Sequence, residues 1–217
     1  MIQKSTLNFL KNLGKNNNRE WFTAHKEEYN KSRADMEEFL MYLISLVAGF
    51  DKSIEHLMPG DCMFRIYRDT RFARDKTPYK TNFGAVLSPQ GNKMKPAGYY
   101  IHIEPGSCMA GGGIYHPEPA ELYKVRQKIE REFPAFSAII TKKSFTKYFD
   151  GIHGDSLVNV PRGFAKDSPA AEFLKFKDLY SMALFTDREV LAPDFAKEVA
   201  KRFKAVKELN DFFRDAM

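Results

Sequence analysis

Apolar residues at helical spacing dominate the first part of the chain. The stretch STLNFLKNLG reads as a short amphipathic helix that Ser5 or Thr6 can cap and Gly14 can end. A longer pattern starts at the capping residue Asn17 and continues to Gly49. Its apolar positions recur every three to four residues and predict one face of a helix, made of Trp21, His25, Tyr29, Met36, Phe39, Leu40, Leu43, Ile44 and Val47.

The period changes at Asp61, where apolar and polar residues begin to alternate. Alternation with a period of two places successive side chains on opposite faces of a strand. It predicts strands over residues 61–69, 80–88, 98–105 and 107–115. The connections between them are short and turn-like, so we expect these strands to pair antiparallel.

Helical spacing returns in the second half of the chain. We expect helices over residues 117–133, 135–149, 168–180 and 193–213, with extended segments at 157–164 and 181–186. No linker rich in glycine, serine or proline separates these elements. Residues 1–217 are therefore predicted to form a single α+β domain, in which helices flank a mainly antiparallel sheet of about residues 61–115.

Composition narrows the class of protein. Hydrophobic residues make up 43% of the chain, and 19 Phe and 10 Tyr favour a rigid core. The longest apolar run starts at Phe39 and is shorter than the about 20 residues of a membrane span, and the N-terminus lacks the apolar region of a signal peptide. Only two cysteines, Cys62 and Cys108, are present. We therefore expect a soluble, cytoplasmic protein with free thiols and no membrane partner.

Positive charge is concentrated in one stretch. The chain has a net charge of +6, and residues 61–110, with eight basic and four acidic side chains, contribute +4 of it. Between Arg65 and Arg74 an arginine recurs every third residue, and Lys76 and Lys80 follow. Guanidinium groups bind phosphate and carboxylate through two parallel hydrogen bonds. An anion site and an internal network with Asp69 and Asp75 are both consistent with this pattern.

An anion site in this stretch defines a set of candidate residues. Strand alternation places Arg65 and Arg71 on one face, and Pro78 can turn Lys80 back toward them. We expect these side chains and Lys76 to converge with Arg126 on one concave, electropositive site. The full set of candidate anion ligands is Arg65, Arg68, Arg71, Arg74, Lys76, Tyr79, Lys80, Arg126 and Arg162.

Candidates for proton transfer are few. His102 shares a predicted strand face with Glu104, and histidine is the usual acid or base at neutral pH. Asp75 is a third candidate. A lone histidine is also a common structural residue, so a structural role for His102 stays open. The glycines 111–113 either let backbone N–H groups approach an anion or mark a hairpin end or bulge. The sequence shows no metal-ligand spacing and predicts neither a cofactor nor a set of catalytic residues.

Several phrases together carry a family resemblance: NNNREWF, RDTRFARDKTPYKTNFG, GYYIHIEP, GGGIYHPEPAELYKVR and PRGFAKDSPAAEFLKFK. In this order and spacing, across nearly the whole chain, they resemble the DUF2461 family of conserved hypothetical proteins. The resemblance implies one domain of unknown activity and supplies no catalytic residues. The family phrase often reads Asp-His-Pro where this chain has Asp167, Ser168 and Pro169, a position that a helix cap by serine explains.

Three functions remain open from the sequence. The favoured one is binding of a small phosphate- or carboxylate-bearing ligand at the Arg/Lys-rich site, with or without enzymatic chemistry. The second is a nucleic-acid surface on which Tyr67, Phe72 or Tyr79 stack on bases, although no nucleic-acid motif is present. The third is a non-enzymatic interaction module in which the arginines are structural bracing. A concave basic cluster favours the first, a flat one the second, and a cluster filled by carboxylates the third.

Overall fold

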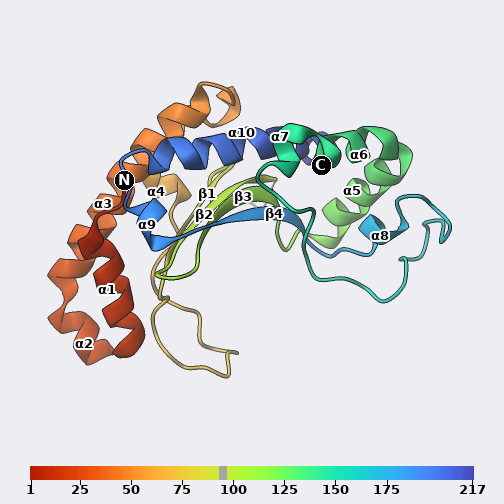
Figure 1. Cartoon of the computed structure of the whole chain (residues 1–217). Helices are drawn as coiled ribbons and strands as arrows, with labels where there is room; N and C mark the ends of the chain where they lie inside the picture. The colour runs from red at the N-terminus through yellow and green to blue at the C-terminus, as the bar shows by residue number, and fades with distance from the viewer. Residues whose placement is uncertain (93–96) are drawn as a thin grey trace.

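The computed structural model describes residues 1–92 and 97–217. The first half contains α1 (Lys4–Lys15), α2 (Arg19–Ala24), α3 (Lys26–Ala48), η1 (Lys52–Ile54), α4 (Pro59–Cys62), β1 (Phe83–Leu87), β2 (Gly98–Ile103) and β3 (Cys108–Ile114) (Figure 1). The second half contains α5 (Pro119–Arg131), α6 (Phe133–Thr141), α7 (Lys143–Thr146), α8 (Ala171–Leu174), β4 (Leu179–Phe185), α9 (Asp187–Val190) and α10 (Phe195–Arg214). The predicted α+β class, with an antiparallel sheet and flanking helices, is confirmed.

The sheet has the strand order β1-β2-β3-β4, with every neighbouring pair antiparallel. Three strands come from the predicted region. The fourth, β4, comes from residues 179–185, after α5, α6, α7 and α8 in the chain. The register places Gly84 opposite His102 and Tyr100 opposite Gly111, and Gly111 lies opposite Met182 on β4. The side chains of Tyr100, His102 and Met182 therefore share one face of the sheet, where Gly84 and Gly111 leave space beside them.

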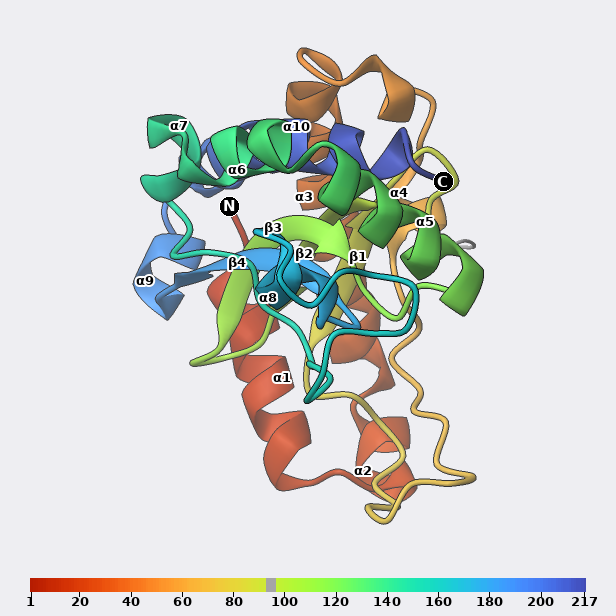
Figure 2. The ribbon, with the colours of Figure 1, turned by 90° about the vertical axis from the view of Figure 1, so that its right-hand side faces the viewer.

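The other face of the sheet is covered by helices. Tyr99, Ile101 and Ile103 of β2 are fully buried in the hydrophobic core. α10 lies across β3 and β2, and α3 packs beside it (Figure 2). At Gly112 a Cβ atom would lie 2.8 Å from Val206 and 2.9 Å from Asn210 of α10. Glycine at this position is therefore what lets the helix approach the strand so closely.

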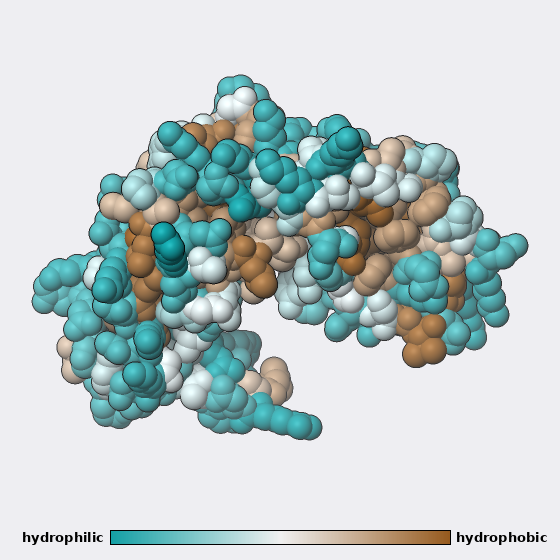
Figure 3. Space-filling model, in the orientation of Figure 1, coloured by the Kyte–Doolittle hydropathy of each residue, from teal (hydrophilic) through white to brown (hydrophobic). Residues whose placement is uncertain are grey.

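The uncovered face gives the molecule the shape of an arch. One end of the arch is formed by α1, α2 and the loop of residues 65–80, and the other by α5, α8 and the segment around residues 150–168 (Figure 1). The space-filling view shows the underside hollowed between the two ends (Figure 3). The sheet thus presents a concave, solvent-facing surface.

Most predicted helical stretches form, but the helix expected from Asn17 to Gly49 is broken at His25 into α2 and α3, and the stretch 135–149 is divided between α6 and α7. α1 begins at Lys4 after Gln3, so neither Ser5 nor Thr6 is its cap. The stripe from Met36 to Val47 is buried on α3 as expected. Asn18 caps α2 by accepting a 2.8 Å hydrogen bond from the Trp21 N–H. The expected cap, Asn17, instead bonds the backbone of Tyr79, donating from Nδ2 to its carbonyl (2.9 Å) and accepting its N–H (3.1 Å). Asn17 therefore ties the start of α2 to the 65–80 loop.

Residues 61–69 differ most from the prediction, because they do not form a regular strand. Pro59 occupies the first turn of α4, a position that proline favours, and the helix carries the chain through Cys62. Only isolated bridges follow, between Met63 and Ala85 and between Tyr67 and Tyr79. The alternating pattern therefore belongs to a loop that folds back on itself as an irregular hairpin.

Two further segments also differ. Residues 157–164 form no strand, and the predicted helix over 168–180 shrinks to the single turn α8. The Ser168 hydroxyl accepts the Ala170 N–H at 3.2 Å, close to the expected capping role. The chain after α8 is then extended because β4 starts at Leu179 and pairs with β3.

Cys62 and Cys108 are buried free thiols. Burial raises the pKa of Cys62 to about 12 and that of Cys108 to about 11, so both stay protonated at neutral pH. In the described ranges, 1–92 and 97–217, no helix combines the length and the apolar character needed to cross a membrane.

A buried ionic network fastens the end of α10. The carboxylate of Asp51 accepts hydrogen bonds from the Tyr99 hydroxyl at 2.7 Å, the Ser53 hydroxyl at 2.6 Å and Arg214 Nη1 at 3.1 Å. Burial alone raises the pKa of Asp51, but the bonds from Ser53, Tyr99 and Arg214 outweigh it and lower the pKa to about 2. The network joins η1, β2 and α10, so it holds the covering helix on the sheet.

We expect Asp51→Asn to lower the free energy of unfolding by about 2 kcal/mol at neutral pH. Because the pKa of Asp51 is depressed on folding, its contribution is complete above the unfolded value near 3.8 and disappears as the pH falls toward 2. Urea unfolding from pH 7 to pH 2 should therefore show the two proteins converging in acid. Glu55→Gln, which removes an exposed carboxylate paired with Lys52, serves as the control and should stay within about 0.5 kcal/mol of wild type.

We also expect Gly112→Ala to destabilise the fold by about 1–3 kcal/mol, because its Cβ forces α10 away from β3. Gly60→Ala is the matched control, since a Cβ at Gly60 meets no atom within 4 Å. Thermal melting of the two variants measures the difference. Equal melting temperatures for both variants would show that α10 shifts at no cost.

Candidate functional site

The candidate site lies on the open face of the sheet, around His102. Strand alternation points Tyr100, His102 and Glu104 to this face while their neighbours enter the core. His102 Nε2 lies 3.0 Å from Glu104 Oε2, and Nδ1 lies 3.0 Å from the Tyr100 hydroxyl. The Asn82 amide is 3.2 Å from the same Nδ1. The histidine is thus held on both ring nitrogens.

Glu104 is anchored as firmly as the histidine. Its Oε1 accepts a hydrogen bond from the Thr81 hydroxyl, while Oε2 faces the imidazole. The His102 side chain is 15% exposed and that of Glu104 is 31% exposed. The pair is therefore partly shielded from water yet reachable from the concave side, as acid–base chemistry requires.

Tyr100 acts as a hydrogen-bond donor in this cluster. Burial raises the pKa of Tyr100 to about 12, and the neighbouring Tyr115 and Glu104 add to the rise. The phenol therefore keeps its proton at neutral pH. Gly84 on β1 makes room for it, because a Cβ there would lie 2.9 Å from the hydroxyl oxygen. A side chain at position 84 would push the phenol away from His102.

Positive charge reaches the cluster through Lys80 and Arg65. The Lys80 ammonium lies 5.3 Å from the centre of the Phe64 ring, and Phe64 in turn packs 6.5 Å from Tyr100. Burial lowers the pKa of Lys80, and the nearby Arg65 lowers it further. Among the described residues no carboxylate forms an ion pair with either cation, although Asp69 lies close enough to Arg65 to be attracted by its charge. Lys80, Arg65 and the His102–Glu104 pair therefore form one neighbourhood at the β1 side of the open face.

The other charges of the 65–80 loop are used within the loop. Arg68 donates to Asp75 at 2.5 Å and to Thr77, and Arg71 grips Asp69 with two bonds of 2.7 and 3.0 Å. Lys76 donates to the Thr70 carbonyl at 2.9 Å. For Arg68, Arg71 and Lys76 the structure thus shows the internal network that the sequence left open. Arg74 is exposed.

The two loop carboxylates are correspondingly acidic. Side-chain and backbone hydrogen bonds from Arg71 lower the pKa of Asp69 to about 2. For Asp75 the backbone N–H of Thr77 contributes most, followed by Arg68 and the Thr77 hydroxyl, and its pKa is also about 2. Asp75 is therefore ionised at neutral pH and stabilises the loop. Its expected role as an acid or base has no support in this geometry.

The predicted convergence with Arg126 does not occur. Arg126 lies on α5 at the opposite end of the arch, where its Nη2 donates to the Phe176 carbonyl at 2.7 Å (Figure 1). Arg162 is exposed on the loop that follows Pro161 at that same end. Tyr79 is buried, stacked 4.0 Å from Phe22, so it braces the loop against α2. The 61–69 strand on which Arg65 and Arg71 were expected to align is absent, and the place of Arg126 depends on how α5 docks.

The glycine run has a structural use. Gly111, Gly112 and Gly113 lie inside β3 and pair with both neighbouring strands. They neither end a hairpin nor sit at a helix N-terminus, since α5 begins at Pro119. In the described part of the chain no three His, Cys, Asp or Glu side chains gather in a way that could hold a metal ion.

Sequence reasoning missed Thr81, Asn82, Tyr100 and Phe64 as members of the site. Strand alternation places Tyr100 on the same face as His102, so Tyr100 could have been predicted from the sequence. Asn82 and Thr81 depend on the β1–β2 register, which pairs Gly84 with His102. Phe64 depends on the path of the irregular hairpin, for which no local pattern exists.

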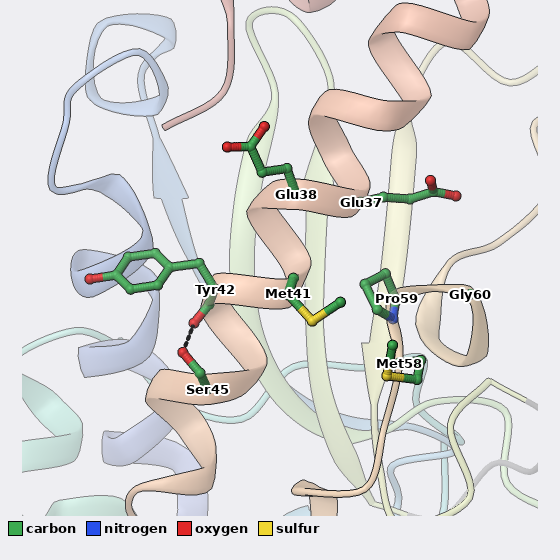
Figure 4. A pocket seen from close by; sticks show the side chains of 8 residues that line it. All are labelled: Glu37, Glu38, Met41, Tyr42, Ser45, Met58, Pro59 and Gly60. Atoms are coloured by element: carbon green, nitrogen blue, oxygen red, sulfur yellow. Dashed lines mark hydrogen bonds between the residues drawn. The ribbon is translucent and has the colours of Figure 1, made fainter.

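A second hollow lies on the opposite side of the molecule, between α3 and α4 (Figure 4). Met41, Tyr42 and Met58 give it an apolar surface, and Glu37 and Glu38 give it an acidic rim. It contains none of the predicted site residues, and its charge is unsuited to an anion. The open face of the sheet is therefore the better candidate.

We expect the neutral His102 imidazole to carry its proton on Nε2. Glu104 can only accept a hydrogen bond there, and the protonated Tyr100 phenol donates to Nδ1. Long-range ¹H–¹⁵N NMR distinguishes the two tautomers. Glu104→Ala should lose the preference, whereas Tyr100→Phe should keep it. A wild-type ring protonated on Nδ1 contradicts this assignment.

Comparison with known proteins agrees with the resemblance noted from the sequence. Residues 5–212 match the family model described as conserved hypothetical protein (DUF2461). No curated protein and no solved structure matches the chain. Because the match covers nearly the whole chain, the protein belongs to the DUF2461 family of conserved hypothetical proteins.

Proposed function

We propose that the open face of the sheet binds a small ligand with a phosphate or carboxylate group, held by Lys80 and Arg65 beside His102 and Glu104. The observation that carries the proposal is Lys80. Its ammonium is half-buried over Phe64, beside a second cation, and the described residues place no carboxylate against it. By contrast, Arg68 and Arg71 of the 65–80 loop are paired with Asp75 and Asp69.

A bound anion offsets the cost of this arrangement. Burying an ammonium next to a guanidinium disfavours its charged form, as the lowered pKa of Lys80 reflects. An anionic group between Lys80 and Arg65 reverses both effects, because it replaces lost hydration and screens the repulsion. Arg65 is exposed, so its side chain is free to swing toward such a ligand.

The polar cluster adds a means of proton transfer. A ligand held at Lys80 lies along the path from Phe64 to Tyr100 and His102. If its polar group replaces the Tyr100 hydroxyl at Nδ1, the imidazole accepts a proton from it, and Glu104 stabilises the resulting imidazolium. This chemistry is part of the proposal and makes His102 its acid–base residue.

A second candidate function rests on Phe72. Its side chain is 95% exposed on the 65–80 loop, with the Arg71 guanidinium 5.9 Å from the ring centre. An exposed ring beside arginines suits stacking on an unpaired base with contacts to its phosphates. Stacking on Phe72 needs a base, whereas binding at Lys80 needs only an anionic group, so one binding assay can distinguish the two candidate functions.

We expect phosphate, sulfate or a nucleotide to raise the melting temperature above the effect of chloride at matched ionic strength. The gain is about 2.7 kcal/mol at one hundred times the dissociation constant. Lys80→Gln should lose the rise, whereas Lys204→Gln, an equal charge change on the exposed side of α10, should keep it. The rise should also fade as pH increases, and at a lower pH than for an ordinary lysine, because binding needs protonated Lys80.

Two results contradict the proposal. One is that no polyvalent anion stabilises the protein more than chloride. The other is that Lys80→Gln responds as wild type does. If a single-stranded oligonucleotide binds instead and Phe72→Ala abolishes its binding, the 65–80 loop is the functional surface and the second candidate is correct.

A further inference from the structure

β4 forms an edge of the sheet, and part of this edge is unpaired in the described residues. On one side β4 pairs with β3 along its whole length. On the other side the backbone of Tyr180 forms bonds of 2.7 and 3.1 Å with the backbone of His153, and the Ser181 hydroxyl donates to the Gly151 carbonyl at 2.6 Å. At its far end the chain turns at Thr186, whose N–H is capped by Glu189. The free edge therefore spans residues 181–185.

The backbone of this edge points outward at two positions. In an antiparallel ladder the hydrogen-bonding direction alternates with a period of two. Tyr180 directs its N–H and C=O to His153, away from β3. Met182 and Leu184 are in phase with it, so their backbone groups face the same way. They are ready to bond another strand.

The edge lacks the features that normally prevent such pairing. Proteins protect exposed edges with lysine, proline, bulges or a covering element. β4, with the sequence LYSMALF, has no charged residue and no proline. Its Leu184 side chain is 75% exposed. In Figure 3 apolar surface shows near the middle of the face that β4 presents.

We propose that this edge pairs with the same edge of a second copy of the chain. A two-fold axis perpendicular to the sheet sets Met182 of one copy opposite Leu184 of the other, and each pair exchanges backbone hydrogen bonds. Their apolar side chains then meet on the open face. The bridge at Tyr180 and the turn at Thr186 limit the new ladder to residues 181–185.

Charge favours a second copy at this place. The chain carries a net charge of +6, so most contacts between copies are repulsive, whereas β4 is uncharged. Asp187, Arg188 and Glu189 follow the end of β4 and carry a net charge of −1, while Lys147, His153 and Arg202 line the groove beside it. Antiparallel pairing brings the acidic end of one copy to the basic flank of the other, twice. Asp150 in this groove is already held by His153 at 2.7 Å.

The pairing joins the two sheets without covering the candidate site. Because the axis is perpendicular to the sheet, both open faces point to the same side. His102 lies on β2, two strands away from the β4 edge. Dimer formation and anion binding are therefore independent, and either can fail without the other.

The experiment measures the mass of the full chain by analytical ultracentrifugation up to about 100 μM, well above a micromolar dissociation constant. We expect wild type to approach twice the chain mass of 25.0 kDa. Leu184→Lys should remain monomeric, because it places a charge on the edge. Leu184→Pro removes only the outward N–H, so the ladder to β3 stays intact, and should also be monomeric. Val158→Lys, at a loop position 90% exposed, is the matched control and should dimerise.

A wild type that stays at 25.0 kDa at the highest concentration overturns the proposal. So does a dimer whose mass both Leu184 variants leave unchanged, since it must use another surface. Circular dichroism and melting temperature show whether each variant is folded. If Leu184→Lys fails to fold, Leu184→Pro decides the question.

Discussion

The close contact between α10 and β3 at Gly112 determines the character of the whole molecule. At this position there is no room for a side chain between helix and strand. The apolar side chains of β2 all point to this covered face, so the opposite face of the sheet can stay open to solvent. A sheet closed on one face and wet on the other is common among antiparallel folds. Here the wet face is also curved, which creates the concave surface with His102.

The 65–80 loop shows how local geometry decides what a run of charges does. Arg71 reaches Asp69 two residues away and grips it with two bonds, and Arg68 reaches Asp75 across the hairpin. Neighbouring opposite charges thus neutralise each other at little entropic cost, because the turn already brings them together. Lys80 lies at the end of the loop, next to β1, and is not part of these ion pairs. The residue of the stretch that is best placed to bind a ligand is therefore the one nearest the sheet.

Much of this architecture was predictable from sequence periodicity, and the exceptions have physical causes. The stripe on α3 and the alternation in β2 each reflect a single buried face, so they reveal both the helix and the side to which His102 and Glu104 point. Residues 61–69 misled because α4 carries the chain through Cys62 and only isolated bridges follow, one of them to Tyr79. Asn17 binds Tyr79 from 62 positions away, and such a long-range bond leaves no local pattern. Arg126 was misplaced for the same reason, since its position depends on how α5 docks.

The order of the elements along the chain has a consequence for biosynthesis. β1, β2 and β3 leave the ribosome before β4 and α10, because synthesis runs from the N-terminus. During that interval Tyr99, Ile101 and Ile103 form an uncovered apolar surface on a nascent sheet. The covered face of the sheet can therefore be completed only after α10, the last helix, has been synthesised.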